Sequence, residues 1–350
     1  MEKKINSLFK NIKLFSKSRE SKVIPIFFAT DDNYIPFLEV AIRSLIEHAS
    51  RKYNYNIHIL NTGLKQENMD VICSLQDENF KVYFEDITSS IDPIKSELKN
   101  CYHFSLVMYY RLFIEKLFPQ YDKVLYLDCD IIVLDDISKL YNTVLGLNLV
   151  GAIKDQVINS NETFKNYARF GIGVEPEKYF NSGILVMNLK KFRQEHICKQ
   201  FMYLVDTYNF DVVDPDQAYL NVLCKDRVKY INNGWNKASL PDKTEGKLSI
   251  AHFALFKKPW QYDDVINGEY FWHYAKMCNM YDKIMLAKNS FDDVKRKQKE
   301  DANVEIADHA LKITNSDNNI YKVLFAKGNL LDVLRRCEFS KIKSVIKAEI

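Results

Sequence analysis

Short apolar segments rich in branched and aromatic residues alternate with amphipathic segments along the first 130 or so residues. Strands are predicted at VIPIFFA (23–29), YNIHIL (55–60), FKVYF (80–84) and KVLYLD (123–128). Helices are predicted between them, at 37–49, near 66–76 and at LVMYYRLFIEKLF (106–118). This alternation is typical of α/β proteins, in which a mainly parallel sheet is flanked by helices.

The chain divides into a main domain and two extensions. Further strands are predicted at 149–153, 183–189 and 248–253. The pattern loosens after about residue 285, where a charged stretch precedes a helical and basic end. We therefore expect a basic amphipathic N-terminal segment (1–22), a main domain (23–285) and a helical, basic C-terminal extension (286–350). A chain of 350 residues is long enough for one large α/β domain with such extensions.

Charge and cysteine content exclude several classes of protein. The net charge of +3 does not suggest a nucleic-acid-binding protein, and seven Lys or Arg against two Glu in residues 1–22 make any basic surface local. Seven scattered cysteines without a C-x-x-C pair indicate reduced thiols, neither a disulfide framework nor a zinc site. Because no signal peptide or membrane-spanning run is recognisable, we expect a cytoplasmic protein.

Two acidic residues interrupt the apolar segment VLYLDCDIIV. On an extended chain Asp128 and Asp130 point to the same side and Cys129 to the other, into the packing. Carboxylates about 5 Å apart repel by roughly 3 kcal/mol at an effective dielectric near 20. A divalent cation such as Mg²⁺ or Mn²⁺ would offset this repulsion. The alternative is that Asp128 only ends the strand and that residues 130–136 form a solvated turn. For Asp135 and Asp136 we prefer a structural role, as the N-cap and first turn of a helix.

No glycine-rich phosphate loop is present. The first glycine is Gly63, and neither G-x-G-x-x-G nor G-x-x-x-x-G-K occurs. Without such a loop the backbone cannot wrap a phosphate in the P-loop or dinucleotide-binding manner. A metal ion and side chains would have to hold any diphosphate.

Six motifs occur in a fixed order: ATDDNY (29–34), YYRL (109–112), KVLYLDCDIIV (123–133), YFNSGILVMNLKKF (179–192), DQAYLN (216–221) and HFALFKKPW (252–260). With them the chain resembles glycosyltransferase family 8, the retaining enzymes that include bacterial lipopolysaccharide galactosyl- and glucosyltransferases and glycogenin. The resemblance covers about residues 23–285. It implies a GT-A (Rossmann-like) fold and metal-dependent transfer of a hexose, galactose or glucose, from a UDP-sugar to a glycan or glycolipid acceptor.

The resemblance also implies roles for individual residues. The metal ligands would be Asp128, Asp130 and His252, and the ion Mn²⁺, with Mg²⁺ as the alternative. Asp216 and Gln217 would form the catalytic centre, where a glutamine is a poor nucleophile and attack on the same face, with the leaving phosphate as base, is preferred. The donor would contact Ala29, Thr30, Asp31, Asn33, Arg111, Asp128, Asp155, Asn181, Ser182, Gly183 and Lys258.

Most of these residues also have a purely structural interpretation. The D-D-N cluster is an ordinary helix cap, the N-S-G cluster a plain turn, and Asp214 or Asp216 the cap of the helix that follows. An arginine on an apolar helix usually pairs with a buried acid, Asp155 could be a surface acid, and a lone histidine at a strand end is more often structural. In the family motif H-x-x-G-x-x-K-P-W, Leu255 here replaces glycine, so we expect a different loop or weaker donor binding.

Both termini carry basic residues and apolar residues at helical spacing, so we expect peripheral association with an anionic inner membrane face, or simply packed surface helices. Membrane association would suit synthesis of a cell-surface polysaccharide or lipopolysaccharide. Two other functions stay open. One is a catalytically silent glycan-binding or scaffold protein; the other is a sugar nucleotidyltransferase, which the lack of any glycine before Gly63 disfavours.

Overall fold

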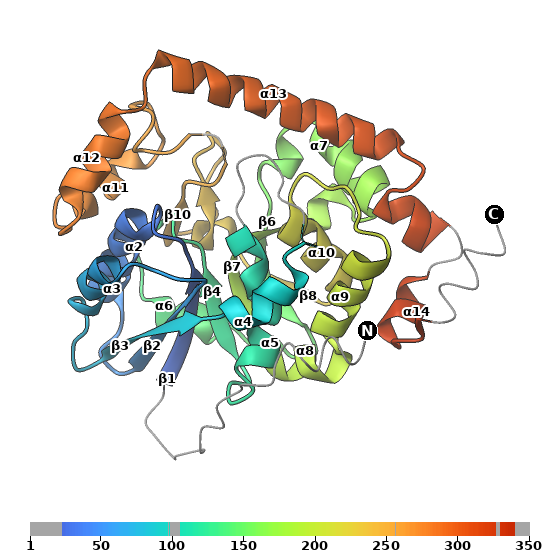
Figure 1. Cartoon of the computed structure of the whole chain (residues 1–350), viewed down its shortest axis with the longest axis horizontal. Coiled ribbons are helices and arrows are strands. Elements are labelled where there is room, and N and C mark those ends of the chain that lie inside the picture. The colour runs from blue at the N-terminus through green and yellow to red at the C-terminus, as the bar shows by residue number, and fades with distance from the viewer. Residues whose placement is uncertain (1–22, 97, 99–105, 256, 327–329, 340–350) are drawn as a thin grey trace.

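The computed structural model describes residues 23–96, 98, 106–255, 257–326 and 330–339. It confirms the predicted α/β fold, a mainly parallel sheet between layers of helices (Figure 1). The strands are β1 (Val23–Ala29), β2 (Asn54–Asn61), β3 (Phe80–Asp86), β4 (Val124–Leu127), β5 (Ile131–Val133), β6 (Val150–Lys154), β7 (Phe180–Met187), β8 (Val228–Tyr230), β9 (Lys237–Ala238) and β10 (Ile250–His252).

Seven strands form the main sheet, in the order β3-β2-β1-β4-β7-β6-β8. All pairs are parallel except those of β7, which runs antiparallel to β4 and to β6. The reversed direction of β7 has a local consequence. It brings the beginning of β7 beside the carboxyl end of β4, where the Asp128 N–H donates to the Gly183 carbonyl at 2.7 Å. Ligands of parallel sheets bind at this edge.

A second sheet joins distant parts of the chain. It has the order β5-β10-β9, and its register sets His252 opposite Ile131, directly after Asp130. The Phe253 N–H also donates to the Asp130 carbonyl, at 2.9 Å. This small sheet therefore carries His252 to the end of β4.

The central strands of the main sheet, β1, β4, β7 and β6, are almost entirely buried, whereas the edge strands β3 and β8 are partly exposed. Along β1, Phe27 and Ala29 belong to one apolar cluster, and Ile24, Ile26 and Phe28 to the other. This is the alternation expected of a strand between two layers of helices. The helices are α2 (Ile35–His48), α3 (Gln66–Cys73), α4 (Thr88–Ile91), α5 (Ile114–Leu117), α6 (Ile137–Tyr141), α7 (Glu162–Asn166), α8 (Leu189–Glu195), α9 (Ile197–Thr207), α10 (Pro215–Leu223), α11 (Gly268–Ala275), α12 (Tyr281–Asn289), α13 (Asp293–Asn315) and α14 (Leu331–Arg335).

The structure tests two local predictions, the helix start at Asp135 and Asp136 and the helix at 106–118. Asp136 is the N-cap of α6, as expected, since its carboxylate accepts a hydrogen bond from the Ser138 N–H at 3.0 Å. The single helix predicted at 106–118 is instead a 3₁₀ helix, Leu106–Phe113, followed by α5. Arg111 lies in the tighter segment, where its Nε donates to the Met108 carbonyl at 3.0 Å, and its guanidinium turns towards the end of β4.

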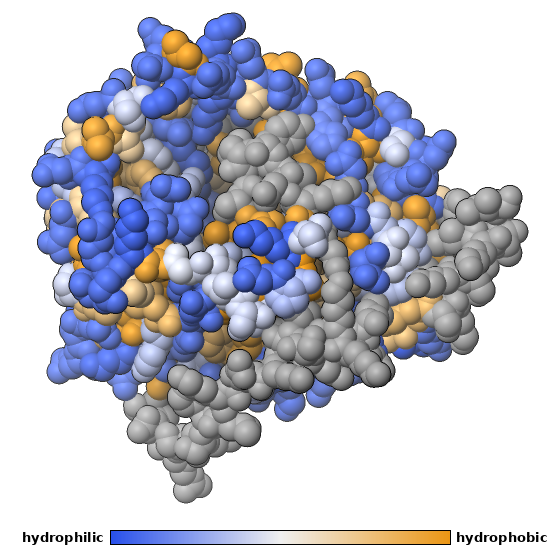
Figure 2. Space-filling model, in the orientation of Figure 1, coloured by the Kyte–Doolittle hydropathy of each residue, from blue (hydrophilic) through white to orange (hydrophobic). Residues whose placement is uncertain are grey.

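The long helix α13 lies in the predicted C-terminal extension and crosses one side of the molecule, from α12 to the region of α7 (Figure 1). It packs on α7 and on the π-helix Tyr167–Ile172. Its outer surface is mostly hydrophilic in the same view (Figure 2). Within the described part of the chain, no helix combines the length and apolar content needed to cross a bilayer. Of the two basic segments behind the membrane prediction, residues 1–22 lie outside the described residues altogether, and the C-terminal one does so from residue 340 onward.

Candidate active site

A cavity of about 490 Å³ opens at the carboxyl end of the main sheet. It collects residues from the first strand, the 3₁₀ helix, the β4–β5 turn, β7, α10 and the segment after β10. Of the residues predicted for the site, those that line it are Ala29, Thr30, Asp31, Asn33, Arg111, Asp128, Asp130, Asn181, Ser182, Gly183, Asp216, Gln217, His252 and Lys258. Asp155 does not line the cavity.

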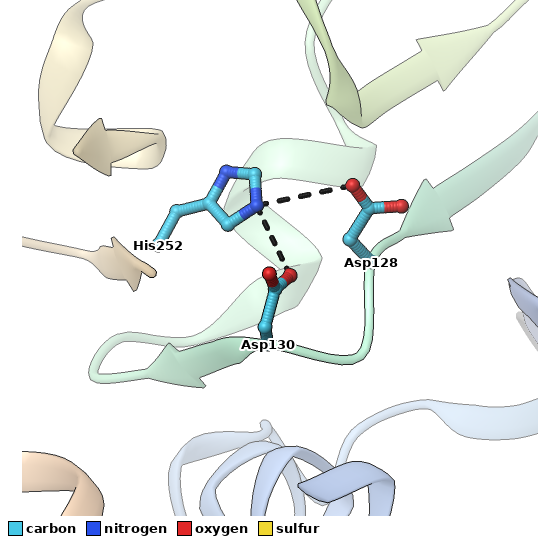
Figure 3. A group of neighbouring side chains, drawn as sticks. All are labelled: Asp128, Asp130 and His252. Carbon is cyan, nitrogen blue, oxygen red and sulfur yellow. Dashed lines mark hydrogen bonds and ion pairs between the residues drawn. The ribbon is translucent and has the colours of Figure 1, made fainter. Parts of the chain in front are cut away.

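Asp128, Asp130 and His252 converge in the cavity (Figure 3). His252 Nε2 lies 3.2 Å from an Asp130 oxygen and 3.8 Å from an Asp128 oxygen. One ligand atom of each residue lies within 4.8 Å of the other two. Cys129 between them is buried in an apolar cluster, as the alternation predicts, although it also borders the cavity. Two carboxylates and one imidazole are a suitable ligand set for Mn²⁺ or Mg²⁺.

A chain of amides fixes the tautomer of His252. The Gly183 N–H donates to Asn181 Oδ1 at 2.9 Å, which identifies the oxygen of that side chain. Asn236 Nδ2 donates to the same oxygen at 2.9 Å, so Asn236 Oδ1 faces His252 Nδ1, at 2.8 Å. Nδ1 therefore donates to Asn236, and Nε2 faces the carboxylates of Asp128 and Asp130. A hydrogen bond of this kind behind the ring is typical of metal-binding histidines, whose other nitrogen is then directed at the ion.

Gly183 leaves the space in which these side chains meet. A Cβ on this residue would lie 2.5 Å from an Asp128 oxygen and 2.5 Å from His252 Cε1. The family resemblance implies a donor contact at this glycine. The groups that approach it most closely are instead the two predicted metal ligands, so any larger residue at 183 would displace them.

Cations balance the acids at this end of the cavity. Burial raises the pKa of the Asp130 carboxyl, but Lys258 and His252 outweigh burial and the pKa lies well below its usual range. Burial lowers the pKa of Lys258, but its ion pair with Asp130 outweighs this and raises the pKa to about 12. Arg111 pairs with Asp128 at 2.9 Å and with Asp216 at 3.1 Å. The expected buried acid beside Arg111 is therefore confirmed, and this arginine also lines the cavity.

The Gln217 side chain is held at both ends of its amide. Its oxygen accepts a hydrogen bond from the Ser182 N–H at 2.9 Å, and its nitrogen donates to Asp155 at 3.1 Å and to Asp214 at 2.9 Å. Ser182 Oγ donates to Asp216 at 2.8 Å. Because the amide oxygen already has a partner, this arrangement supports a positioning role and disfavours nucleophilic attack by Gln217.

Asp155 and Asp214 lie behind this amide. Asp155 is buried and also accepts a hydrogen bond from Asn181, so the alternative of a surface acid is wrong. Asp214 is the N-cap residue of α10, one of the two positions considered, but its side chain makes no capping hydrogen bond; Asp216 lies in the first turn. Asp214 instead accepts hydrogen bonds from Tyr167 at 2.6 Å and Tyr179 at 2.7 Å. Burial raises the pKa of Asp214 to about 7, against those hydrogen bonds and with the help of Asp155.

The segment after β1 forms a turn before α2 and lines the cavity. Asp31 Oδ1 accepts hydrogen bonds from the N–H groups of Asn33 and Tyr34, at 3.0 and 3.2 Å, and so closes the turn before α2. Asp31 and Asn33 also line the cavity. The N-cap of α2 itself is Tyr34, without a side-chain hydrogen bond, so Asp31 shapes the turn and does not cap the helix. The ligand role of Asp31 and Asn33 stays a prediction.

Leu255 adopts a left-handed backbone conformation, with φ +61°. Glycine takes this conformation without strain, whereas a leucine does so at a cost. The leucine side chain lines the cavity and packs on the apolar cluster that contains Phe27 and Ala29. Its effect on donor binding stays a prediction.

Three polar residues of the site were missed or misassigned from the sequence. Asn236 lies in N-N-G-W-N, which matches no motif; Asp214 was considered only as a cap; and Lys299 lies in the charged stretch of the C-terminal extension. Each acts through a contact with a distant part of the chain, to Asn181, Tyr167 and Gln261 respectively. No local pattern signals such contacts.

Comparison with known proteins identifies the class as a glycosyltransferase. The galactosyltransferase LgtC, in a complex described as containing donor and acceptor sugar analogs, superposes with a TM-score of 0.63 at 28% identity, over 73% of this chain and 96% of LgtC. The bifunctional glycosyltransferase WbbM gives 0.68 at 25% identity, over 79% of this chain and 53% of WbbM. These neighbours confirm the GT-A type of fold.

The family model "Glycosyl transferase family 8" matches residues 25–264, so the chain belongs to glycosyltransferase family 8. A Haemophilus influenzae protein named as a glycosyltransferase is 33% identical over 218 residues, covering 62% of this chain and 64% of the relative. The chain thus spans just under two thirds of that relative. Lipopolysaccharide 1,2-glucosyltransferase of Escherichia coli is 26% identical over 261 residues, covering 69% of this chain and 73% of the relative.

Proposed function

We propose that the protein is a metal-dependent, retaining glycosyltransferase that transfers a hexose, galactose or glucose, from a UDP-sugar to a glycan or glycolipid acceptor. The observation that carries the proposal is the convergence of Asp128, Asp130 and His252 beside Lys258 in one cavity at the carboxyl edge of the sheet. Two similar proteins support this substrate class: the relative named lipopolysaccharide 1,2-glucosyltransferase, and LgtC, whose structure is described as a complex with donor and acceptor sugar analogs.

In this proposal the cavity is divided along its length. Asp31 and Asn33 would hold the nucleoside, while Lys258 and a metal ion bound by Asp128, Asp130 and His252 would hold the diphosphate. A bound Mn²⁺ or Mg²⁺ would neutralise the charge that builds up on the departing UDP. Arg111, Asn181, Ser182 and Asp216, which line the same cavity, would surround the hexose.

The same-face route is the one that the Gln217 contacts favour. Its amide oxygen accepts a hydrogen bond from the Ser182 N–H, which makes an already poor nucleophile weaker and favours an orienting role. The acceptor hydroxyl would attack on the face from which UDP leaves. The bond from the anomeric carbon to the phosphate oxygen breaks as the bond to the acceptor oxygen forms, and the acceptor proton passes to the leaving phosphate.

Release of UDP from a panel of UDP-sugars tests the proposal, with Mn²⁺ or Mg²⁺ and with a chelator. We expect release from one or a few UDP-hexoses, at a rate that the chelator abolishes. UDP binding without release from any UDP-sugar would favour a catalytically silent glycan-binding protein. Membrane association stays a prediction, which binding to vesicles with and without anionic lipid would test.

A further inference from the structure

Lys299 differs from its neighbours on α13. Residues 292–298 and Glu300 are exposed, whereas Lys299 is half-buried and lines the same cavity as the predicted metal ligands. The helix that carries it lies outside the residues matched by the family model. The extension therefore contributes to the cavity that the main domain forms.

The contacts of Lys299 place it beside Lys258. Its ammonium group donates to Gln261 Oε1 at 2.6 Å, and the Gln261 N–H donates to the Lys258 carbonyl at 2.9 Å. Lys299 is thus docked on the turn that presents Lys258 to Asp130. Burial, together with the positive charge of Lys258, lowers the pKa of Lys299 to about 8.

The charges around Lys299 indicate what it binds. Among the described residues, the arginine and lysine side chains that line the cavity are Arg111, Lys258 and Lys299. Arg111 pairs with Asp128 and Asp216, and Lys258 pairs with Asp130. In the described structure Lys299 donates a hydrogen bond only to a neutral amide, and the nearest anion that acts on it, Asp130, is already paired with Lys258. A half-buried ammonium near a second one is unfavourable unless an anion neutralises both.

We propose that Lys299 is a second lysine for the diphosphate of the nucleotide donor, so that α13 forms part of the donor site. This inference rests on the proposed UDP-sugar function. The ammonium group of Lys258, in the turn after β10, and that of Lys299, on α13, would bind the diphosphate together. Binding of the donor would thereby fasten the C-terminal extension to the main domain.

Calorimetric titration of the full chain with UDP and with uridine, in the presence of Mn²⁺, tests this proposal. Lys299→Met should lower the affinity for UDP about tenfold and leave the affinity for uridine unchanged, because one charge-assisted contact with phosphate is lost. Lys299→Arg should retain most of the affinity. Lys297→Met is the matched control, since Lys297 is on the same helix and its side chain is 79% exposed. It should bind UDP like the wild type.

The outcomes separate the two proposals. If wild-type protein binds UDP and Lys299→Met, with an unchanged melting temperature, binds it equally tightly, the role of Lys299 is wrong and the proposed function stands. Equal losses for UDP and uridine, or a change confined to the KM for the acceptor, would likewise overturn a diphosphate contact. If wild-type protein binds no UDP at all, both proposals fail.

Discussion

The two ends of the cavity balance their acids by different means. At the metal end, Asp130 faces Lys258 and His252, and the resulting pKa lies well below the usual range. At the other end, Asp214 faces the hydroxyl groups of Tyr167 and Tyr179, and burial raises its pKa to about 7. Charge balanced by charge suits an ionic ligand. Charge balanced by neutral hydrogen bonds suits sugar hydroxyls, and leaves the acid sensitive to pH.

The two ends are joined by side-chain amides. Asp155 accepts a hydrogen bond from Asn181 at 3.1 Å. From Asn181 the series of side-chain hydrogen bonds continues through Asn236 to His252. The same Asp155 also accepts from Gln217. The residues that hold the predicted catalytic amide therefore also orient the predicted metal-binding imidazole.

The largest expected effect is at the metal end. Asp130→Asn should reduce UDP release and transfer by at least about two orders of magnitude, because one ligand charge and the partner of Lys258 are lost together. Steady-state kinetics at saturating Mn²⁺ measures the change. Asp136→Asn is the control, since asparagine caps α6 equally well. Activity of the Asp130 variant without added metal would show that the assigned role is wrong.

The next effect tests the connection between the ends. Asn236→Ala should weaken Mn²⁺ binding about 10- to 100-fold, because His252 Nδ1 loses the acceptor that fixes its tautomer. Asn236→Asp keeps the acceptor for His252 Nδ1 but sets a second oxygen against Asn181 Oδ1, so it should recover only part of the affinity. Calorimetric titration of Mn²⁺ into each variant gives the comparison. Similar affinities for the alanine variant and the wild type would mean that the amide chain does not orient the ligand.

The neutral end should show itself in the pH dependence of stability. The carboxyl of Asp214 has a raised pKa in the folded state, so its contribution to stability is complete below the unfolded pKa and is lost as the pH rises through about 7. Relative to Asp214→Asn, the wild type should lose about 2 kcal/mol of unfolding free energy between about pH 5.5 and about pH 8. Urea unfolding at several pH values measures the difference.

Glu115 provides a matched comparison outside the cavity. Burial raises its pKa to about 7, against a hydrogen bond from the Cys198 N–H at 2.7 Å. Glu115→Gln should therefore change the pH dependence of stability in the same sense, without altering the transfer rate. Parallel stability curves for the wild type and Asp214→Asn would show that Asp214 ionises at an ordinary pKa.

The sequence predicted the parts of the site that depend on local patterns. The strand β1 and the shared side of Asp128 and Asp130 follow from apolar segments and from alternation, and the motif resemblance supplied His252 and Lys258. The contacts of Asn236 and Lys299 could not be predicted in this way, because their partners lie 55 and 38 residues away. Such contacts are set by the packing of β9 and α13, which the amphipathic pattern does not encode.

The smallest expected effect concerns backbone strain at the metal end. Leu255 lies between His252 and Lys258 with a positive φ of +61°, which costs a non-glycine residue about 1 kcal/mol. Leu255→Gly and Leu255→Ala both remove the packed side chain, but only glycine relieves the strain. The glycine variant should therefore be about 1 kcal/mol more stable than the alanine variant, the reverse of the usual order at positions that alanine tolerates. Urea unfolding of the pair measures this; an alanine variant at least as stable as the glycine variant would mean that position 255 stores no strain.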